Sequence, residues 1–263
     1  RDGHGHLYRF KDGSWTQLTK GDWEVAELVG VDEAKGRVTF LGNKDGVLER
    51  HLYTVDLNKP GAVTRISEPG FWHAAKGNDA ASRIIVTRSK GDQPAQVMLT
   101  DGSGKRLAWV NENKVAGDHP YAPYLAAHRA KQFGTIKAAD GTDLHWEMIT
   151  PKLEPGKKYP VFFQHYGGPH SQQVSKAWSG ALQQYIVDRG YIWFVIDNRG
   201  AANRGKAFED HLFQAMGGVE VQDQLAGAAY LKTLGFVDPA KITTYGWSYG
   251  GYMTLKMLQA APG

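Results

Sequence analysis

Five consecutive residues, Gly246-Trp247-Ser248-Tyr249-Gly250, have the Gly-x-Ser-x-Gly pattern of a hydrolase nucleophile. Lys241–Tyr245 has the composition of a strand that runs into them, and residues 252–258 have helix-compatible spacing. A serine between such a strand and helix lies in a strained turn, where side chains at positions 246 and 250 would crowd it. The pattern therefore predicts Ser248 as a nucleophile, and we expect Gly251 to let the helix pack closely against the sheet.

A second motif with chemical potential is His165-Tyr166-Gly167-Gly168-Pro169, directly after the strand-like run 161–164. In strand–turn–helix hydrolases a Gly-rich loop at this place supplies one donor of the oxyanion hole, and the N–H after the nucleophile, here that of Tyr249, supplies another. Such donors stabilise the negative charge of a tetrahedral intermediate. Tyr166 could add its hydroxyl, and the alternative is a core tyrosine beside a tight turn.

The remaining candidates for chemistry do not form a metal or phosphate site. His4, His6, His165 and His170 lack a His-Glu-x-x-His pattern, acids at ligand spacing and any cysteine partner. Gly102-Ser103-Gly104-Lys105 lacks the full spacing of a phosphate-binding loop and lies in a hairpin-like turn. We therefore expect no metal and no cofactor.

Composition favours a soluble globular protein. The chain has 263 residues, of which 41% are hydrophobic and 22% charged, enough for a sizeable core. Its net charge is +4, but Lys and Arg are scattered among acids, so nucleic-acid binding is not expected. The absence of cysteine excludes disulfides and thiol catalysis and leaves the redox compartment open. The longest apolar runs, such as Tyr191–Ile196, are too short to span a membrane.

The first 125 residues consist of short strand-like runs separated by turn signals. Three runs of similar sequence recur at steps of about 45 residues, the period of a four-stranded propeller blade: 6–10, 51–56 and 96–101. Residues 38–41 similarly correspond to 84–87. We interpret residues 1–125 as the C-terminal blades of a β-propeller, and an irregular β-sandwich is the alternative.

From residue 126 onward the pattern changes to alternating strands and helices, which is typical of a parallel α/β sheet. A hairpin is expected at 133–150, and apolar runs at 159–163 and 191–196 suit strands buried on both faces. Helices are expected at 177–189 and 218–234. We interpret residues 126–263 as the N-terminal half of an α/β-hydrolase catalytic domain, with about five of its eight strands.

The two motifs together resemble the dipeptidyl peptidase IV branch of the prolyl oligopeptidase (S9) family of serine peptidases. The matching residues are Gly-Trp-Ser-Tyr-Gly-Gly-Tyr at 246–252 and Tyr-Gly-Gly-Pro at 166–169, with 197–200 and 218–224 at the expected order and distances. The resemblance spans the whole second part, and the first part is where the family's propeller ends. It implies an incomplete α/β hydrolase preceded by the last blades of a β-propeller.

The resemblance also implies roles for single residues. Ser248 would be the nucleophile, and Tyr166 would donate its hydroxyl to the oxyanion. Tyr249 would donate its N–H while its ring lines a proline pocket, and Trp247 would pack at the elbow beside that pocket. The implied reaction removes N-terminal dipeptides with Pro or Ala second, through an acyl-enzyme. Peptide substrates are the expected partners, a homodimer is one conceivable assembly, and the expected location is periplasmic or secreted.

One requirement of that reaction is missing from these residues. The triad order in this architecture is Ser, then Asp or Glu, then His, but residues 249–263 contain none of the last three. The glutamates that grip the substrate amine would lie upstream of Arg1. We therefore expect a fragment that is close to inert alone, completed by about 100 further residues. The alternatives are a carboxylesterase or acylaminoacyl-type hydrolase, and a non-catalytic binding protein on a hydrolase scaffold.

Overall fold

The computed structural model describes residues 3–261, which form two compact units. The first unit consists of residues up to Leu125 together with Ser175–Trp178 and Asn203–Lys206. The second unit consists of Ala126–Val174, Ser179–Ala202 and the residues from Ala207 onward. Over the described residues, no helix combines the length and the apolar character needed to cross a bilayer.

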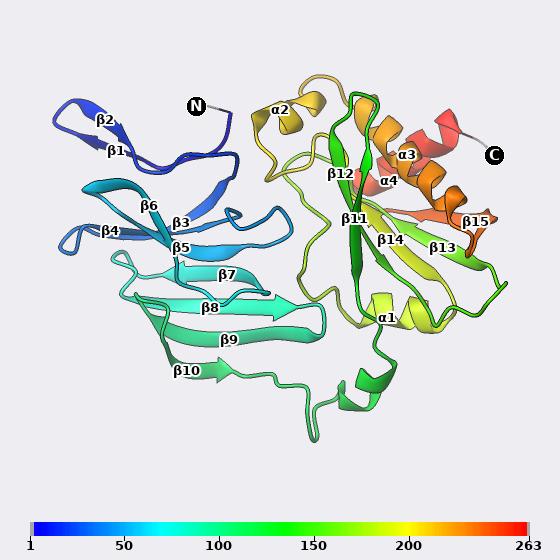
Figure 1. The fold of residues 1–263 in the computed structure, drawn as a ribbon, viewed down its shortest axis with the longest axis horizontal. Coiled ribbons are helices and arrows are strands. Elements are labelled where there is room, and N and C mark those ends of the chain that lie inside the picture. The colour runs from blue at the N-terminus through cyan, green and yellow to red at the C-terminus, as the bar shows by residue number, and fades with distance from the viewer. Residues whose placement is uncertain (1–2, 262–263) are drawn as a thin grey trace. The chain divides into compact units, whose positions relative to one another are not determined.

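The first unit is made of antiparallel strands in three sheets (Figure 1). Sequential strands pair within a two-stranded sheet and two four-stranded sheets: β1 (Tyr8–Lys11) and β2 (Ser14–Gln17); β3 (Val25–Asp32), β4 (Arg37–Gly42), β5 (His51–Asp56) and β6 (Lys59–Arg65); β7 (Trp72–Gly77), β8 (Arg83–Lys90), β9 (Gln93–Asp101) and β10 (Arg106–Asn111). Two of the three repeated runs, 51–56 and 96–101, lie in the third strands β5 and β9 of the four-stranded sheets, and the run at 6–10 overlaps β1 of the two-stranded sheet. The second pair of similar runs lies in β4 and β8.

Local turn chemistry explains how the first of these hairpins closes. Asp12 and Gly13 connect β1 and β2 with φ values of 50° and 76°. Two successive residues with positive φ match the right-handed twist of the flanking strands, which is why Asp-Gly is favoured there.

The segment Ser175–Trp178 belongs to the first unit and changes one expected helix. Lys176 donates its N–H to the Leu48 carbonyl at 3.0 Å and pairs with Glu49. The Trp178 ring lies edge-on to Tyr121 at 5.1 Å between centroids. The helix expected at 177–189 therefore begins only at Ala181 and ends at Asp188, because its first residues are held in an irregular segment.

The second unit has a five-stranded mixed sheet in the order β11-β12-β14-β13-β15. Its strands are β11 (Gln132–Lys137), β12 (Asp143–Ile149), β13 (Tyr159–Gln164), β14 (Ile192–Ile196) and β15 (Val237–Tyr245). The helices of the described chain are α1 (Ala181–Asp188), α2 (Lys206–Glu209), α3 (Val219–Thr233) and α4 (Tyr249–Ala260), and 3₁₀ turns lie at Ala122–Ala127 and Asp210–Leu212. The expected hairpin is β11–β12, and β13 runs parallel to both β14 and β15.

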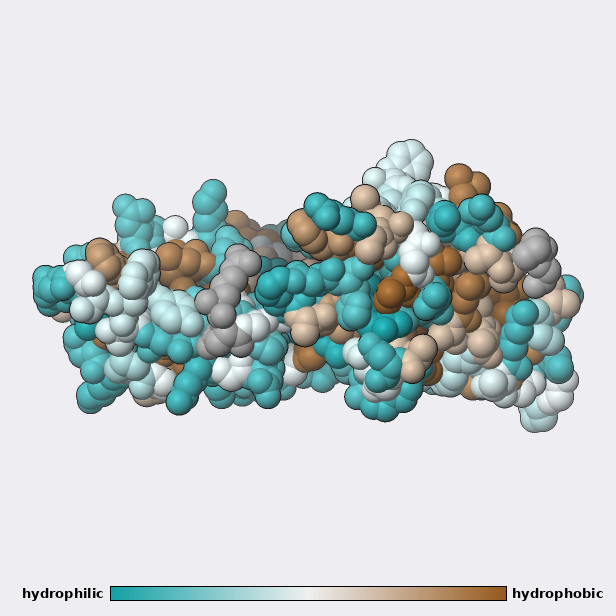
Figure 2. Space-filling view, turned by 90° about the horizontal axis from the view of Figure 1, so that it is seen from above, coloured by the Kyte–Doolittle hydropathy of each residue, from teal (hydrophilic) through white to brown (hydrophobic). Residues whose placement is uncertain are grey.

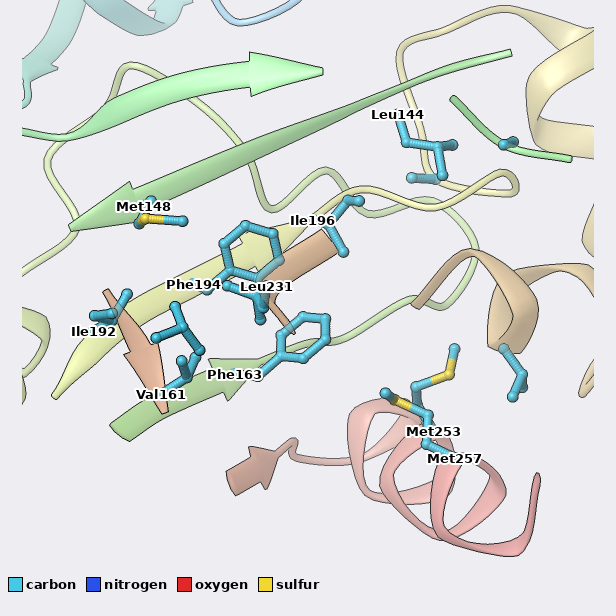
Figure 3. Packing of buried hydrophobic residues seen from close by; sticks show 14 of the residues in the cluster. Leu144, Met148, Val161, Phe163, Ile192, Phe194, Ile196, Leu231, Met253 and Met257 are labelled. Carbon is cyan, nitrogen blue, oxygen red and sulfur yellow. The ribbon is translucent and has the colours of Figure 1, made fainter. Parts of the chain in front are cut away.

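The core of the second unit packs helices against this sheet (Figure 3). Every residue of β14 is buried, as its unbroken apolar sequence predicts for a central strand. Phe163 of β13 lies edge-on to Phe194 of β14 at 5.1 Å. Met253 and Met257 bring α4 into the same cluster. The sheet and α4 therefore share one hydrophobic core, which fixes the turn between β15 and α4.

Hydrophilic and apolar side chains are mixed on the surface (Figure 2). Figure 2 shows hydrophilic residues over much of one face, with hydrophobic residues reaching the surface in patches.

A buried ion pair connects three segments of the second unit. The Arg199 guanidinium donates to both carboxylate oxygens of Asp223 on α3, at 2.7 and 2.9 Å. It also donates to Asp140 in the β11–β12 turn at 2.7 Å. Arg199 and Asp223 are 5% and 1% exposed, so each charge needs the other.

Replacing Arg199 with Met should lower the free energy of unfolding by about 3 kcal/mol, because the Asp223 carboxylate stays buried without its partner. Lys137→Met is the control, since the Lys137–Asp143 pair is 66% and 47% exposed and should contribute less than about 1 kcal/mol. Urea unfolding of the chain measures both. Equal effects of the two substitutions would show that the buried pair does not stabilise this unit.

Candidate active site

Ser248 lies at the sharp turn between β15 and α4. Its backbone has φ 57° and ψ −119°, a conformation that costs a non-glycine residue about 1–3 kcal/mol. The first turn of α4 holds it there, since Gly251 and Tyr252 both donate their N–H groups to the Ser248 carbonyl, at 2.9 and 3.2 Å. The side chain is exposed and makes no capping hydrogen bond. The serine is therefore presented outward by a strained backbone.

The glycines of the motif allow backbone to approach backbone. A Cβ on Gly246 would overlap the backbone of Gly250, and a Cβ on Gly250 would overlap the carbonyl of His165 at the end of β13. Gly251 differs from the expectation, because its Cβ would meet only the Gly246 carbonyl at 3.6 Å, an ordinary contact. Gly250, and not Gly251, is the residue that lets α4 lie close to the sheet.

The loop that carries Tyr166 packs directly on this turn. A Cβ on Gly168 would lie 2.6 Å from Cγ of Tyr249, and one on Gly167 would lie 2.6 Å from Cε of Met253. The rings of Tyr166 and Tyr249 are 5.9 Å apart between centroids. The two motifs meet because β13 and β15 are parallel neighbours, so their carboxyl ends lie at one edge of the sheet. The structure therefore places the Tyr166 loop against Tyr249, the residue that follows Ser248.

Tyr249 is held by polar as well as aromatic contacts. Its hydroxyl donates to Oε1 of Glu220 at 2.9 Å, and its ring lies edge-on to Tyr252 at 5.2 Å. Burial, and then the hydrogen bond to the Glu220 carboxylate, raise the pKa of the Tyr249 hydroxyl. The phenol therefore stays protonated and acts as a donor.

Trp247 does not pack at the elbow as expected. It is 81% exposed within the described chain, so its ring is not packed against the turn. Its predicted place beside a substrate pocket stays a prediction.

The residues that support the Tyr166 loop were not assigned roles from the sequence. Asn198, after β14, donates to the Gly167 carbonyl at 3.0 Å, and Gln224 of α3 donates to Asn198 at 2.8 Å. Glu220, Asp223 and Gln224 share one buried face of α3. The spacing of these three residues could have indicated this face, because residues three and four apart lie on one side of a helix.

His165 is a buried, neutral histidine next to the turn. Thr254 uses its hydroxyl proton to donate to the Gly250 carbonyl at 2.9 Å, so Nε2 of His165 must donate to Thr254 Oγ1, also at 2.9 Å. Nδ1 has no hydrogen-bond partner among the described residues. A second proton would find no acceptor, and burial lowers the pKa of His165 to about 4.

No three His, Asp or Glu side chains within residues 3–261 gather in an arrangement that could hold a metal ion.

Family models match both ends of the chain. The model of the dipeptidyl peptidase IV N-terminal region matches residues 1–95, and that of the prolyl oligopeptidase family matches residues 178–263, which include Ser248. The chain belongs to the dipeptidyl peptidase IV branch of the prolyl oligopeptidase family.

Relatives within this family match nearly the whole chain. "Probable dipeptidyl peptidase 4" of Aspergillus fumigatus is 32% identical over 100% of this chain and 35% of its own length. Human "Dipeptidyl peptidase 8" is 34% identical over 92% of this chain and 28% of its own length. The crystal structure of Porphyromonas gingivalis dipeptidyl peptidase 4 superposes with a TM-score of 0.87 at 30% identity, covering 98% of this chain and 36% of that one. The chain thus spans about a third of the length of these proteins.

Gly250→Ala should lower the free energy of unfolding by at least about 2 kcal/mol, because the new methyl group meets the His165 carbonyl. Gly251→Ala is the matched control one residue later, and should be neutral or stabilise by up to about 1 kcal/mol through helix propensity. Thermal or urea unfolding of both variants checks this. A destabilised Gly251→Ala variant with a stable Gly250→Ala variant would reverse our assignment.

His165 should make the chain less stable in weak acid. Its folded pKa of about 4 lies below its ordinary value of 6.5, so between these values the unfolded state binds the extra proton. The free energy of unfolding then falls as pH decreases through this window, by up to about 1.4 kcal/mol per pH unit. His165→Asn should reduce that slope, and His170→Asn, at an exposed position, should not. Burial also lowers the pKa of His73 to about 4, so part of the pH dependence of the unfolding free energy remains in both variants. Parallel pH profiles of wild type and His165→Asn would contradict this.

Proposed function

We propose that the whole protein that carries this chain is a serine exopeptidase. It releases N-terminal dipeptides with Pro or Ala at the second position, through an acyl-enzyme formed on Ser248. The observation that carries the proposal is the packing of the Tyr166 loop on the strained turn that presents Ser248. The names of the relatives, which are dipeptidyl peptidases, support the same substrate class.

In this proposal Ser248 Oγ attacks the carbonyl carbon of the second residue, and the carbonyl oxygen gains the negative charge. The N–H of Tyr249 is a donor for that charge, because it belongs to the first turn of α4, where N–H groups lack helical partners. The Tyr166 hydroxyl is the second donor. Collapse of the tetrahedral intermediate breaks the peptide bond to the third residue, whose amine leaves with the proton taken from Ser248. Water then hydrolyses the ester of the acyl-enzyme, which releases the dipeptide and restores the Ser248 hydroxyl.

The Tyr249 ring is the proposed wall for the side chain of the second residue. A proline ring is flat and rigid, so an aromatic face buries it without loss of side-chain freedom. The contacts of Tyr249 with the Gly168 backbone and with Glu220 support a fixed wall.

The reaction also needs a base that accepts the Ser248 proton. Residues 249–263 contain no His, Asp or Glu, and the one histidine packed at the turn, His165, is buried and hydrogen-bonded to Thr254. The proposal therefore assigns the triad Asp and His to other parts of the whole protein, which would complete an α/β hydrolase after the last propeller blades. A periplasmic or secreted location and a homodimer belong to the same proposal.

Ser248→Ala in the whole protein should abolish both labelling by a fluorophosphonate and cleavage of a chromogenic Gly-Pro substrate. Loss of the oxygen nucleophile removes the group that each reagent acylates or phosphonylates. Ser171→Ala, also beyond the end of β13, is the control and should keep both activities.

Three outcomes separate the candidate functions. A wild type that is neither labelled nor active supports a binding protein on this scaffold. Labelling with ester hydrolysis but without Gly-Pro cleavage supports a carboxylesterase or acylaminoacyl-type hydrolase. Labelling with dipeptide release supports the proposal.

Tyr166→Phe should lower kcat on the same substrate by about 10²–10³, with little change in KM, because the hydroxyl stabilises charge that exists only in the transition state. Steady-state kinetics measure this. A rise in KM at unchanged kcat would instead make Tyr166 a substrate-binding residue.

A further inference from the structure

Glu220 is a buried acid whose position is explained only in part by helix α3. It is 0% exposed and lies two residues after the N-cap, Gly218. Its Oε2 accepts the N–H of Gly218 at 3.1 Å, and its Oε1 accepts the N–H of Gly217. The carboxylate thus caps α3, whose N-cap glycine has no side chain to do so.

The same carboxylate also reaches the neighbouring helix. Oε1 accepts the Tyr249 hydroxyl at 2.9 Å from the first turn of α4. Capping alone does not require this contact, because the carboxylate already accepts the Gly217 and Gly218 N–H groups without any donor from Tyr249. The hydrogen bond instead fixes the far end of a ring whose near end is confined by the Gly168 backbone.

We propose that Glu220 is the positioning residue that holds the Tyr249 ring as the wall for the second residue of the substrate. The inference rests on the proposed function, since it concerns the same pocket. Its physical basis is that rotation about the Cα–Cβ bond, which swings the whole ring, would carry the Tyr249 hydroxyl away from Glu220 and break a hydrogen bond to a charged acceptor.

Glu220→Ala in the whole protein should raise KM for a Gly-Pro substrate by about tenfold, with kcat changed less than about twofold. Tyr249→Phe removes only the hydroxyl, leaves the cap of α3 intact, and should raise KM to the same extent. The double variant should be no worse than either single one, because both remove one interaction. Glu220→Gln returns an acceptor oxygen and should recover most of the loss.

A purely structural role for Glu220 gives a different pattern. Glu147→Ala is the matched control, since Glu147 is a second buried acid of this unit, paired with Lys131 at 3.0 Å. It should destabilise the protein as Glu220→Ala does, while KM stays unchanged. Additive effects of Glu220→Ala and Tyr249→Phe on KM, or an equal rise in Glu147→Ala, would overturn the proposal.

A measurement without turnover separates this proposal from the proposed function. With 3-fluorotyrosine at position 249, the ¹⁹F signal reports the hydrogen bond of the adjacent hydroxyl. The signal should shift in Glu220→Ala and stay in place in Glu147→Ala. An unmoved signal in Glu220→Ala overturns the positioning role even if dipeptides are released, and a shifted signal in a protein without peptidase activity rejects only the proposed function.

Discussion

The candidate site depends on one steric constraint, the approach of backbone to backbone where β15 turns into α4. Gly246 lies against Gly250, and Gly250 lies against the carbonyl that ends β13. No side chain fits between them, so strand, turn and helix close on each other at the smallest possible separation. The positive φ of Ser248 follows, because the chain must reverse within one residue to enter the helix.

A second layer of polar contacts builds on this packing. Asn198 donates a hydrogen bond to the loop after β13, and Gln224 of α3 in turn donates to Asn198. Arg199 connects Asp223, also on α3, to the β11–β12 turn. Each of these groups is buried and hydrogen-bonded, so none can move without leaving a polar atom unpaired. The loop and the elbow are thus supported by one connected set of side chains on α3 and after β14.

Those parts of the fold and of the candidate site that depend on local sequence could be predicted from the sequence. The apolar run of β14 and the Asp-Gly turn of β1–β2 signal their conformations directly, and the glycine pattern locates the elbow. The start of α1 could not be predicted, because Trp178 and its neighbours pack in the first unit through contacts distant in sequence. The polar face of α3 was missed for a related reason. Glutamate is usually exposed, so its residue type does not predict burial. The hydrogen bonds that Glu220 accepts from Gly217, Gly218 and Tyr249 stabilise its carboxylate in the buried position.

The conformation of Ser248 has a consequence for how such a sequence changes over time. At φ 57° a glycine would be unstrained, so replacing the serine with glycine would relieve backbone strain and favour the folded state. Drift toward greater stability would therefore remove the hydroxyl. A serine at this position therefore carries backbone strain that a glycine would not, and the proposed role of its oxygen atom as a nucleophile accounts for that cost.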